Sequence, residues 1–309
     1  MHGEKPVTFD RRTMLASGSA LLASTIATGC VPMDTSLPGR LSAHLRIIEA
    51  ASGGALGAAI LDTGSGKILG NRLDERFAHC SSFKLSLAAL AMQRSANGGD
   101  AFDTLLPITA EDIVSYSPVT KERVGQMMTI ADLAKTTLTT SDNAAANILM
   151  RQFGGPEAVT AFWRSVGDEI SRLDRYETAL NFVPPGEVRD TTTPRAMANT
   201  VRTILYGATL PSDMQQTLRG WMTETSTGTK RIRAGIPASW KAGDKTGTAF
   251  APGMGSFYVD LAFAEPPEGA PLVIATYLRL TAVHERVEPE SEAVLASVGA
   301  LATRMAPKA

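Results

Sequence analysis

Residues 240–280 read WKAGDKTGTAFAPGMGSFYVDLAFAEPPEGAPLVIATYLRL, and their pattern indicates the central sheet of the protein. Three apolar runs of strand length lie at 240–249, 256–264 and 272–280. The second and third runs are joined by Pro266-Pro267-Glu268-Gly269, which is typical of a tight turn. We therefore predict three consecutive antiparallel strands.

Helices are predicted on both sides of these strands along the chain. Residues 290–305 place apolar side chains on one helix face, and Pro289 suits the first helical turn. Residues 41–51 show the same spacing, and Gly53-Gly54 ends that helix. A hairpin comes next, with its first strand, turn and second strand expected at 55–61, 62–66 and 67–69.

The middle of the chain, residues 74–224, shows mostly helical periodicity. One stretch, 172–194, has little periodicity and holds Pro184-Pro185-Gly186; a loop of this length in a compact domain is usually functional or disordered. The simplest assembly is an α+β fold. In it, an antiparallel sheet is flanked by N- and C-terminal helices, and an all-helical subdomain lies beside it. We place the discontinuous α/β subdomain at 41–73 and 225–309.

The composition excludes several classes of function. The 309 residues carry a formal net charge of −1, so the chain lacks the basic excess of a nucleic-acid binder. Two cysteines, Cys30 and Cys80, are too few for a disulfide framework. The four histidines have no zinc-binding spacing, so we predict no metal and no cofactor, and a metal-dependent hydrolase is disfavoured.

The first thirty residues are predicted to be an export signal. Arg11-Arg12 precede an apolar run at 14–27 that is too short and polar to span a membrane, and the pair resembles a twin-arginine signal. Residues 27–30 resemble a lipoprotein cleavage site with Cys30 to be lipidated, although Ala27 replaces the usual leucine. Alternatively, the arginines are ordinary signal charges and Cys30 is incidental. We expect a periplasmic protein whose only membrane contact is a lipid on Cys30.

A candidate nucleophile lies at the start of an apolar segment, residues 83–92, that reads as a buried helix. In Ser81-Ser82-Phe83-Lys84, the first serine and the lysine share a helix face. A serine hydroxyl needs a neighbouring base, and a buried lysine with reduced charge can serve as one. The alternative is a capping serine with a lysine that reaches solvent, which the motif alone favours.

Two further motifs change that balance. Ser141-Asp142-Asn143 offers a second hydroxyl and an amide, and the alternative is a helix cap. Lys245-Thr246-Gly247 lies on a predicted strand, where its lysine and hydroxyl suit a carboxylate. Gly247 would let a substrate approach the backbone. The alternative is a strand end with a solvated lysine.

Together the three motifs resemble those of the penicillin-recognising serine enzymes, which are β-lactamases and penicillin-binding proteins. Within the irregular loop, Glu177-Thr178-Ala179-Leu180-Asn181 matches the Glu-x-x-Leu-Asn pattern of class A β-lactamases. Arg175 and Asp190 resemble the ion pair that pins the omega loop of that class. The resemblance runs from about residue 41 to the C-terminus and implies a class A serine β-lactamase with that family's fold.

The resemblance also implies residue roles in catalysis. Ser81 attacks the lactam carbonyl, and the N–H groups of Ser81 and Thr248 form the oxyanion hole. Ser141 passes a proton to the departing nitrogen. Glu177 and Asn181 position the water that clears the ester, and either Lys84 or Glu177 takes the first proton.

The same resemblance assigns substrate contacts. Asn143 holds the side-chain amide of the antibiotic, and Tyr116 belongs to one wall of the site. The remaining contacts grip the carboxylate of the substrate; they are Lys245, Thr246, Gly247, Thr248 and Arg231.

Two positions depart from the usual pattern. Phe257 falls where many class A enzymes carry an arginine, so Arg231 becomes the candidate carboxylate anchor. Cys80 corresponds to a position that is disulfide-bonded in some carbapenem-hydrolysing members. Its partner position here is Ala249, so we predict that Cys80 is a free, buried thiol.

Three alternatives to a β-lactamase remain open. A penicillin-binding D,D-peptidase shares three motifs but would not need Glu177. A non-hydrolysing β-lactam sensor usually comes with a membrane-spanning transducer, and a non-catalytic scaffold would not retain the intact motifs. We expect a monomer that acts on a small-molecule β-lactam.

Overall fold

The computed structural model describes residues 36–306 of the chain. The predicted export signal, including Arg11-Arg12 and Cys30, therefore lies outside the described residues. Within residues 36–306, no helix combines the length and the apolar character needed to cross a membrane.

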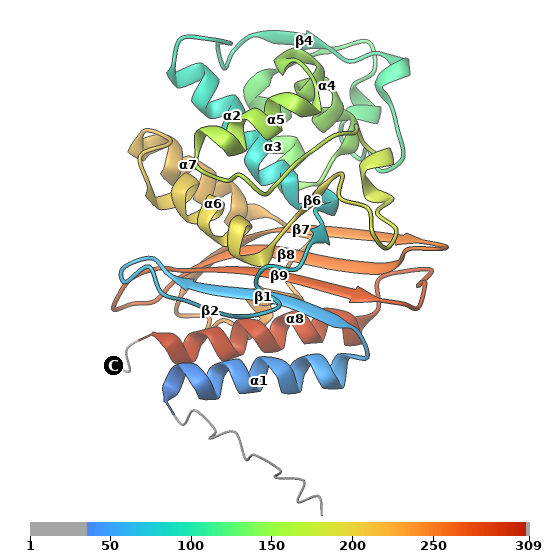
Figure 1. Cartoon of the computed structure of the whole chain (residues 1–309). Helices are drawn as coiled ribbons and strands as arrows, with labels where there is room; N and C mark the ends of the chain where they lie inside the picture. The colour runs from blue at the N-terminus through green and yellow to red at the C-terminus, as the bar shows by residue number, and fades with distance from the viewer. Residues whose placement is uncertain (1–35, 307–309) are drawn as a thin grey trace, which may run out of the picture. The chain divides into compact units, whose positions relative to one another are not determined.

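A five-stranded antiparallel sheet joins the two ends of the described chain (Figure 1), in the order β2-β1-β9-β8-β7. Its strands are β1 (Ala55–Asp62), β2 (Ile68–Asn71), β7 (Lys241–Ala251), β8 (Gly255–Glu265) and β9 (Leu272–Leu280). The three strands predicted from residues 240–280 are confirmed, with ends that differ by at most two residues. Because β9 pairs with both β1 and β8, the N-terminal hairpin and the C-terminal strands form one sheet.

Helices α1 (Leu37–Ser52) and α8 (Pro289–Ala302) cover one face of this sheet (Figure 1). Leu41 and Leu45 of α1 and Val298 of α8 belong to the same buried cluster as Ile60 and Ile274 of the strands. Burial of such side chains supplies roughly 1.5–3 kcal/mol each against conformational entropy. The apolar side chains whose spacing predicted the two terminal helices are thus the ones that pack against the sheet.

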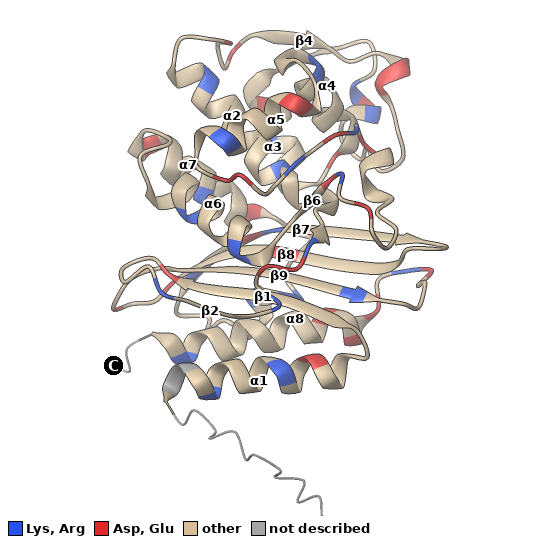
Figure 2. Cartoon of the chain, in the orientation of Figure 1, with Lys and Arg blue, Asp and Glu red and all other residues tan. Residues whose placement is uncertain are grey.

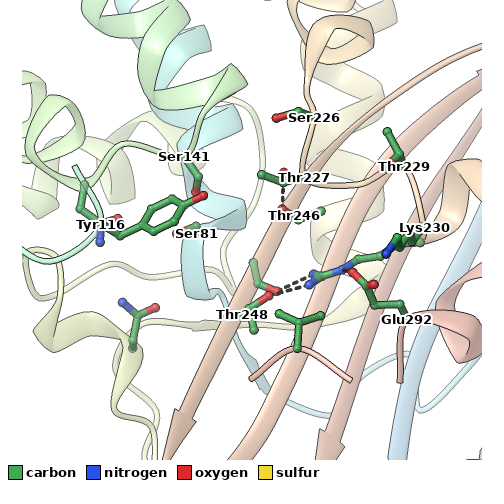
Figure 3. Close-up of a pocket in the computed structure, with 15 residues that line it drawn as sticks. Ser81, Tyr116, Ser141, Ser226, Thr227, Thr229, Lys230, Thr246, Thr248 and Glu292 are labelled. Atoms are coloured by element: carbon green, nitrogen blue, oxygen red, sulfur yellow. Dashed lines mark hydrogen bonds and ion pairs between the residues drawn. The ribbon is translucent and has the colours of Figure 1, made fainter. Parts of the chain in front are cut away.

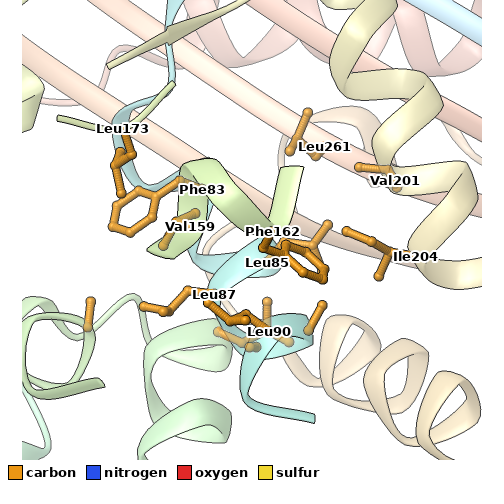
Figure 4. Packing of buried hydrophobic residues seen from close by; sticks show 14 of the residues in the cluster. Phe83, Leu85, Leu87, Leu90, Val159, Phe162, Leu173, Val201, Ile204 and Leu261 are labelled. Carbon is orange, nitrogen blue, oxygen red and sulfur yellow. The ribbon is translucent and has the colours of Figure 1, made fainter. Parts of the chain in front are cut away.

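A helical part covers the other face. Its main helices are α2 (Lys84–Ala96), α3 (Ile130–Thr139), α4 (Asn143–Phe153), α5 (Pro156–Ser165), α6 (Pro194–Tyr206) and α7 (Ser212–Glu224). Every residue from Lys84 to Met92 of α2 is buried, as the apolar run predicted. Figure 4 shows Leu85, Leu87 and Leu90 of α2 among side chains of α5 and α6. The molecule therefore has the predicted α+β architecture.

Two short strand pairs fix loops in the helical part. They are β3 (Phe77–Ala78) with β6 (Thr191–Thr192), and β4 (Leu105–Pro107) with β5 (Met127–Thr129). The first pair joins the segment just before Ser81 to the end of the irregular loop 172–194. Pairing thus couples the predicted nucleophile to the predicted omega loop.

Charged residues are spread over both parts, and the strands carry few of either sign (Figure 2). Several are nevertheless buried, among them Lys84, Glu177 and Lys245. Buried charges are stable only when they are paired or hydrogen-bonded, so their surroundings indicate a site.

Candidate active site

Ser81 lies in the 3₁₀ turn Cys80–Phe83, which leads directly into α2. The turn packs against β7 at Gly247: a Cβ built on this glycine would lie 2.9 Å from Cys80 Cβ and 3.0 Å from Ser81 N. Gly247 also lines the pocket, so the approach of a substrate to its backbone stays a prediction, and the structure adds a second reason for the glycine: a side chain here would meet the turn of the nucleophile.

Gly247→Ala is expected to lower kcat/KM about 100-fold, because an added methyl group pushes β7 away from the turn of Ser81. Steady-state kinetics with a penicillin would measure the loss. Gly220→Ala on α7 is the matched control, since a Cβ there meets no atom within 4 Å. Wild-type activity in Gly247→Ala would show that the turn and β7 separate freely.

Lys84 is fully buried next to Ser81. Its Nζ donates to Ser81 Oγ at 3.1 Å, to the Ser141 carbonyl at 2.8 Å and to Asn143 Oδ1. The same atom lies 3.0 Å from Glu177 Oε1. Burial lowers the pKa of Lys84, and the charge of Glu177 opposes this effect. The lysine therefore loses a proton more readily than an exposed one.

Glu177 is held by both its backbone and its carboxylate. Its N–H donates to Asn147 Oδ1 and its carbonyl accepts from Asn147 Nδ2, each at 2.9 Å. Oε2 accepts from Asn181 Nδ2 at 2.5 Å, and Oε1 accepts from the Ser81 hydroxyl at 3.3 Å. Helix α4, which carries Asn147, thus places a loop carboxylate beside the serine.

The omega loop is anchored by Asp190, whose side chain is fully buried. Arg175 Nε lies 2.5 Å from Asp190 Oδ2, which confirms the predicted ion pair. The backbone N–H groups of Asp174 and Arg175 donate to Asp190 Oδ1 at 2.8 and 3.1 Å. The carbonyl of Asp190 accepts from His79 N at 3.0 Å, two residues before Ser81. The loop and the nucleophile therefore share one hydrogen-bonded frame.

A second serine and lysine meet across the pocket. Lys245 Nζ donates to Ser141 Oγ at 3.0 Å and to the Thr246 carbonyl at 2.7 Å. Burial and the nearby charge of Lys84 hold the pKa of Lys245 well below its usual value. Ser141, like Cys80 and Tyr116, has a positive φ, a strained conformation that clusters at functional sites.

These residues surround a pocket of about 540 Å³ (Figure 3). The predicted site residues that line it are Ser81, Tyr116, Ser141, Asn143, Asn181, Arg231, Thr246, Gly247 and Thr248. Lys84, Glu177 and Lys245 do not line it, but each contacts Ser81 or Ser141. The structure therefore brings all the predicted site residues together.

Part of the lining was not predicted from the sequence: Ser226, Thr227, Thr229, Lys230, Val287 and Glu292. The first four lie in the turn after α7, beside Arg231, and only that arginine pointed to them. Val287 precedes α8 and Glu292 lies on it, and no motif marks either residue.

Arg231 is almost entirely occupied by the protein. Nη1 donates to the carbonyls of Gly247 and Val259 at 2.9 Å, and Nη2 donates to Thr248 Oγ1 at 2.7 Å. Nε lies 3.2 Å from Glu292 Oε1. The residue lines the pocket, but its bonds orient Thr248 and leave little of the guanidinium for a ligand.

Phe257 does not face this pocket. Its side chain lines a separate cavity under the omega loop, together with Val183 and Met254. The next residue, Tyr258, instead lies under the Arg231 guanidinium, 5.5 Å from carbon to ring centroid. Because side chains alternate along a strand, Phe257 faces away from the substrate pocket, whereas Tyr258 lies beside Arg231.

Cys80 is fully buried and forms no disulfide with any described residue, as predicted. Burial also raises the pKa of its thiol, so that the residue stays protonated. Cys80 thus packs as a small apolar side chain behind Ser81.

His79 stacks on Trp163 at 4.6 Å, and burial lowers its pKa to about 3, against the opposing charge of Asp168. The unfolded chain therefore binds more protons between pH 6.5 and 3, so stability falls as pH falls through this range. Between pH 7 and pH 4.5 the unfolding free energy of the wild type falls, and we expect it to fall by about 2–3 kcal/mol less in His79→Met. Urea unfolding at both pH values measures this, with exposed His44→Gln as control; equal losses in wild type and His79→Met would contradict it.

The fold and the arrangement of Ser81, Lys84, Ser141 and Glu177 are those of a penicillin-recognising serine hydrolase. A model of the β-lactamase enzyme family matches residues 40–305. β-Lactamase AST-1 of Nocardia asteroides is 43% identical over 275 residues, covering 86% of this chain and 87% of the relative. β-Lactamase FAR-1 of Nocardia farcinica is 46% identical over 235 residues, covering 76% of this chain and 74% of the relative.

The structure comparison agrees with the sequence comparison. An ancestral (GNCA) class A β-lactamase is 46% identical and matches with a TM-score of 0.80, covering 85% of this chain and 99% of that one. The chain belongs to the class A β-lactamase family and hydrolyses the ring of β-lactam antibiotics, EC 3.5.2.6.

Proposed function

We propose that hydrolysis proceeds through an ester on Ser81 that Glu177 clears. The observation that carries this proposal is the double contact of one buried carboxylate: Oε1 reaches the Ser81 hydroxyl, and Oε2 is held by Asn181. A water held between the carboxylate and Asn181 would lie beside the acylated oxygen. A carboxylate in this place can take a proton from that water as it attacks the ester.

In the first step Ser81 Oγ bonds to the lactam carbonyl carbon and the ring C–N bond then breaks. The hydroxyl proton has two acceptors in reach, Lys84 Nζ and Glu177 Oε1. Lys84 accepts only when neutral, which its lowered pKa favours. On either route, the departing nitrogen takes a proton from Ser141, which Lys245 can then replace.

The developing oxyanion is bound by two backbone N–H groups. Strand β7 lies at the edge of the sheet, and the Thr246 carbonyl points away from β8, toward Lys245 Nζ. Residues two apart on a strand face the same side, so the N–H of Thr248 points there too. With the N–H of Ser81 it forms a two-donor site, and each donor is worth about 3–4 kcal/mol in such sites.

The ends of the pocket hold the rest of the substrate. Thr246 and Thr248, with the charge of Lys245 behind them, suit the carboxylate of the bicyclic nucleus. Asn143 and the exposed ring of Tyr116 lie toward the other end, where the acylamino side chain fits. Bound in this way, the lactam carbonyl lies over Ser81.

Acid quenching during turnover of a penicillin, followed by intact-mass analysis, tests the ester route. We expect an adduct of the mass of the penicillin in the wild type and none in Ser81→Ala. An adduct that persists in Ser81→Ala would exclude Ser81 as the nucleophile. A wild-type adduct that never clears would instead favour a penicillin-binding protein or sensor.

We also propose that the protein is exported to the periplasm, is lipidated on Cys30 and acts as a monomer. Arg11-Arg12 and the residues 27–30 support the first two parts, and a pocket built from one chain supports the third. Cell fractionation of wild type and Cys30→Ser tests the anchor, since loss of the lipid should move activity from the membrane to the soluble periplasm. Light scattering of the mature protein tests the oligomeric state.

A further inference from the structure

One end of the pocket has no role in the reaction proposed above. Beyond Thr248, seen from Ser81, lie Thr229, Lys230 and Glu292 (Figure 3), and Val287 also lines the pocket. These residues come from the turn after α7, from the segment just before α8 and from α8 itself, and none belongs to a sequence motif.

The charges of this end leave one cation unpaired. Arg231 and Glu292 are both buried and lie 3.2 Å apart, so they form a neutral pair. Lys230 is exposed on the pocket wall, and its ammonium has no ion pair or hydrogen bond with any residue from 36 to 306. An anion entering this end would meet Lys230 before any other free charge.

The proposed binding mode indicates which part of a substrate arrives there. In this orientation the carboxylate of the bicyclic nucleus lies on Thr246 and Thr248, and the acylamino group lies near Asn143. The substituent on the ring atom next to the carbon that bears the carboxylate then points away from Ser81. In cephalosporins that atom is C3. Val287 offers this substituent an apolar contact and Thr229 a hydroxyl.

We propose that Lys230 is a specificity-determining residue, and that this end of the pocket selects cephalosporins whose C3 substituent carries a second negative charge. The inference rests on the proposed orientation of the substrate. Lys230 attracts the second anion through solvent, so the effect is that of a partly exposed ion pair and weakens with salt.

Cefamandole and cefonicid form a matched pair of probes. They share the mandelyl side chain, the nucleus and its carboxylate, and differ in the group on the C3 tetrazole, which is methyl in cefamandole and sulfomethyl in cefonicid. The quantity to compare is the ratio of kcat/KM for cefonicid to that for cefamandole. We expect Lys230→Gln to lower this ratio about two- to fivefold and Lys230→Glu to lower it further.

Two controls isolate the position of the charge. Lys67→Gln removes an exposed lysine from the β1–β2 turn and should leave the ratio unchanged. About 1 M NaCl, where the screening length is about 3 Å, should bring the wild-type ratio to that of Lys230→Gln. Where turnover of either cephalosporin is slow, its inhibition constant against penicillin hydrolysis gives the same ratio.

The outcomes separate this inference from the proposed function. If both cephalosporins and penicillins are hydrolysed but the ratio is equal in wild type and Lys230→Gln, only the anion subsite is wrong. If Lys67→Gln lowers the ratio as much as Lys230→Gln, net charge and not the subsite explains it. If Ser81→Ala still forms an adduct, the substrate orientation fails and the subsite fails with it.

Discussion

Glu177→Gln is expected to react with a penicillin at Ser81 and then to stall as the covalent adduct. Glutamine has nearly the shape of glutamate and can still accept the hydrogen bond from Asn181, but it cannot take a proton from water. The loss of a general base lowers a rate about 10²–10⁴-fold, and here the loss falls on hydrolysis of the ester. Intact-mass analysis over time measures formation and decay of the adduct separately.

Glu187→Gln is the matched control for this experiment. Glu187 lies in the same loop, but its carboxylate pairs with Arg189 at 2.6 Å. Its replacement should leave both steps unchanged. If Glu177→Gln fails to form the adduct, Glu177 is also the base for the first step and Lys84 is not. If it turns over like the wild type, another group activates the water.

Lys84→Met is expected to lower kcat/KM about 10³-fold and also to destabilise the protein by about 3–5 kcal/mol at neutral pH. The side chains of Lys84 and Glu177 are both fully buried, so removing the lysine leaves a carboxylate without its counter-charge. Urea unfolding at neutral pH measures the loss of stability.

A double-mutant cycle tests the physical cause of this loss. Lys84→Met with Glu177→Gln removes both charges, so it should recover part of the stability that Lys84→Met loses. Lys135→Met is the control for loss of a lysine, since its pair with Glu224 at 2.8 Å is solvent-exposed and worth about 0–1 kcal/mol. If Lys84→Met costs no more than Lys135→Met, the buried pair does not hold the site together.

The sequence predicted the residues whose chemistry is local. Ser81 and Lys84 share one helical turn, and Glu177 and Asn181 share a five-residue pattern, so spacing alone brings each pair together. The strands at 240–280 were found for a similar reason, because their apolar runs and turns are continuous in the chain. The joining of both chain ends into one sheet followed from the need to cover every apolar face.

What the sequence did not predict depends on contacts between distant segments. Glu292 and Val287 reach the pocket because α8 packs against β8 and β9, and the bonds that occupy Arg231 come from three separate segments. The sequence also did not predict that Phe257 lines a separate cavity under the omega loop, because that depends on how the loop packs against β8. The packing of Gly247 against Ser81 involves residues more than 160 positions apart.

The place of β9 between β1 and β8 has a consequence for synthesis. Until residue 280 has been made, β1 has no partner on its inner edge and β8 pairs only with β7, and unpaired strand edges promote aggregation. Almost the whole polypeptide must thus be synthesised before the helices that precede β9 in the chain can pack against the complete sheet. A nonsense mutation before Leu272 would leave β1 and β8 without β9. We expect the truncated chain to aggregate and to have no β-lactamase activity, so that it confers no resistance.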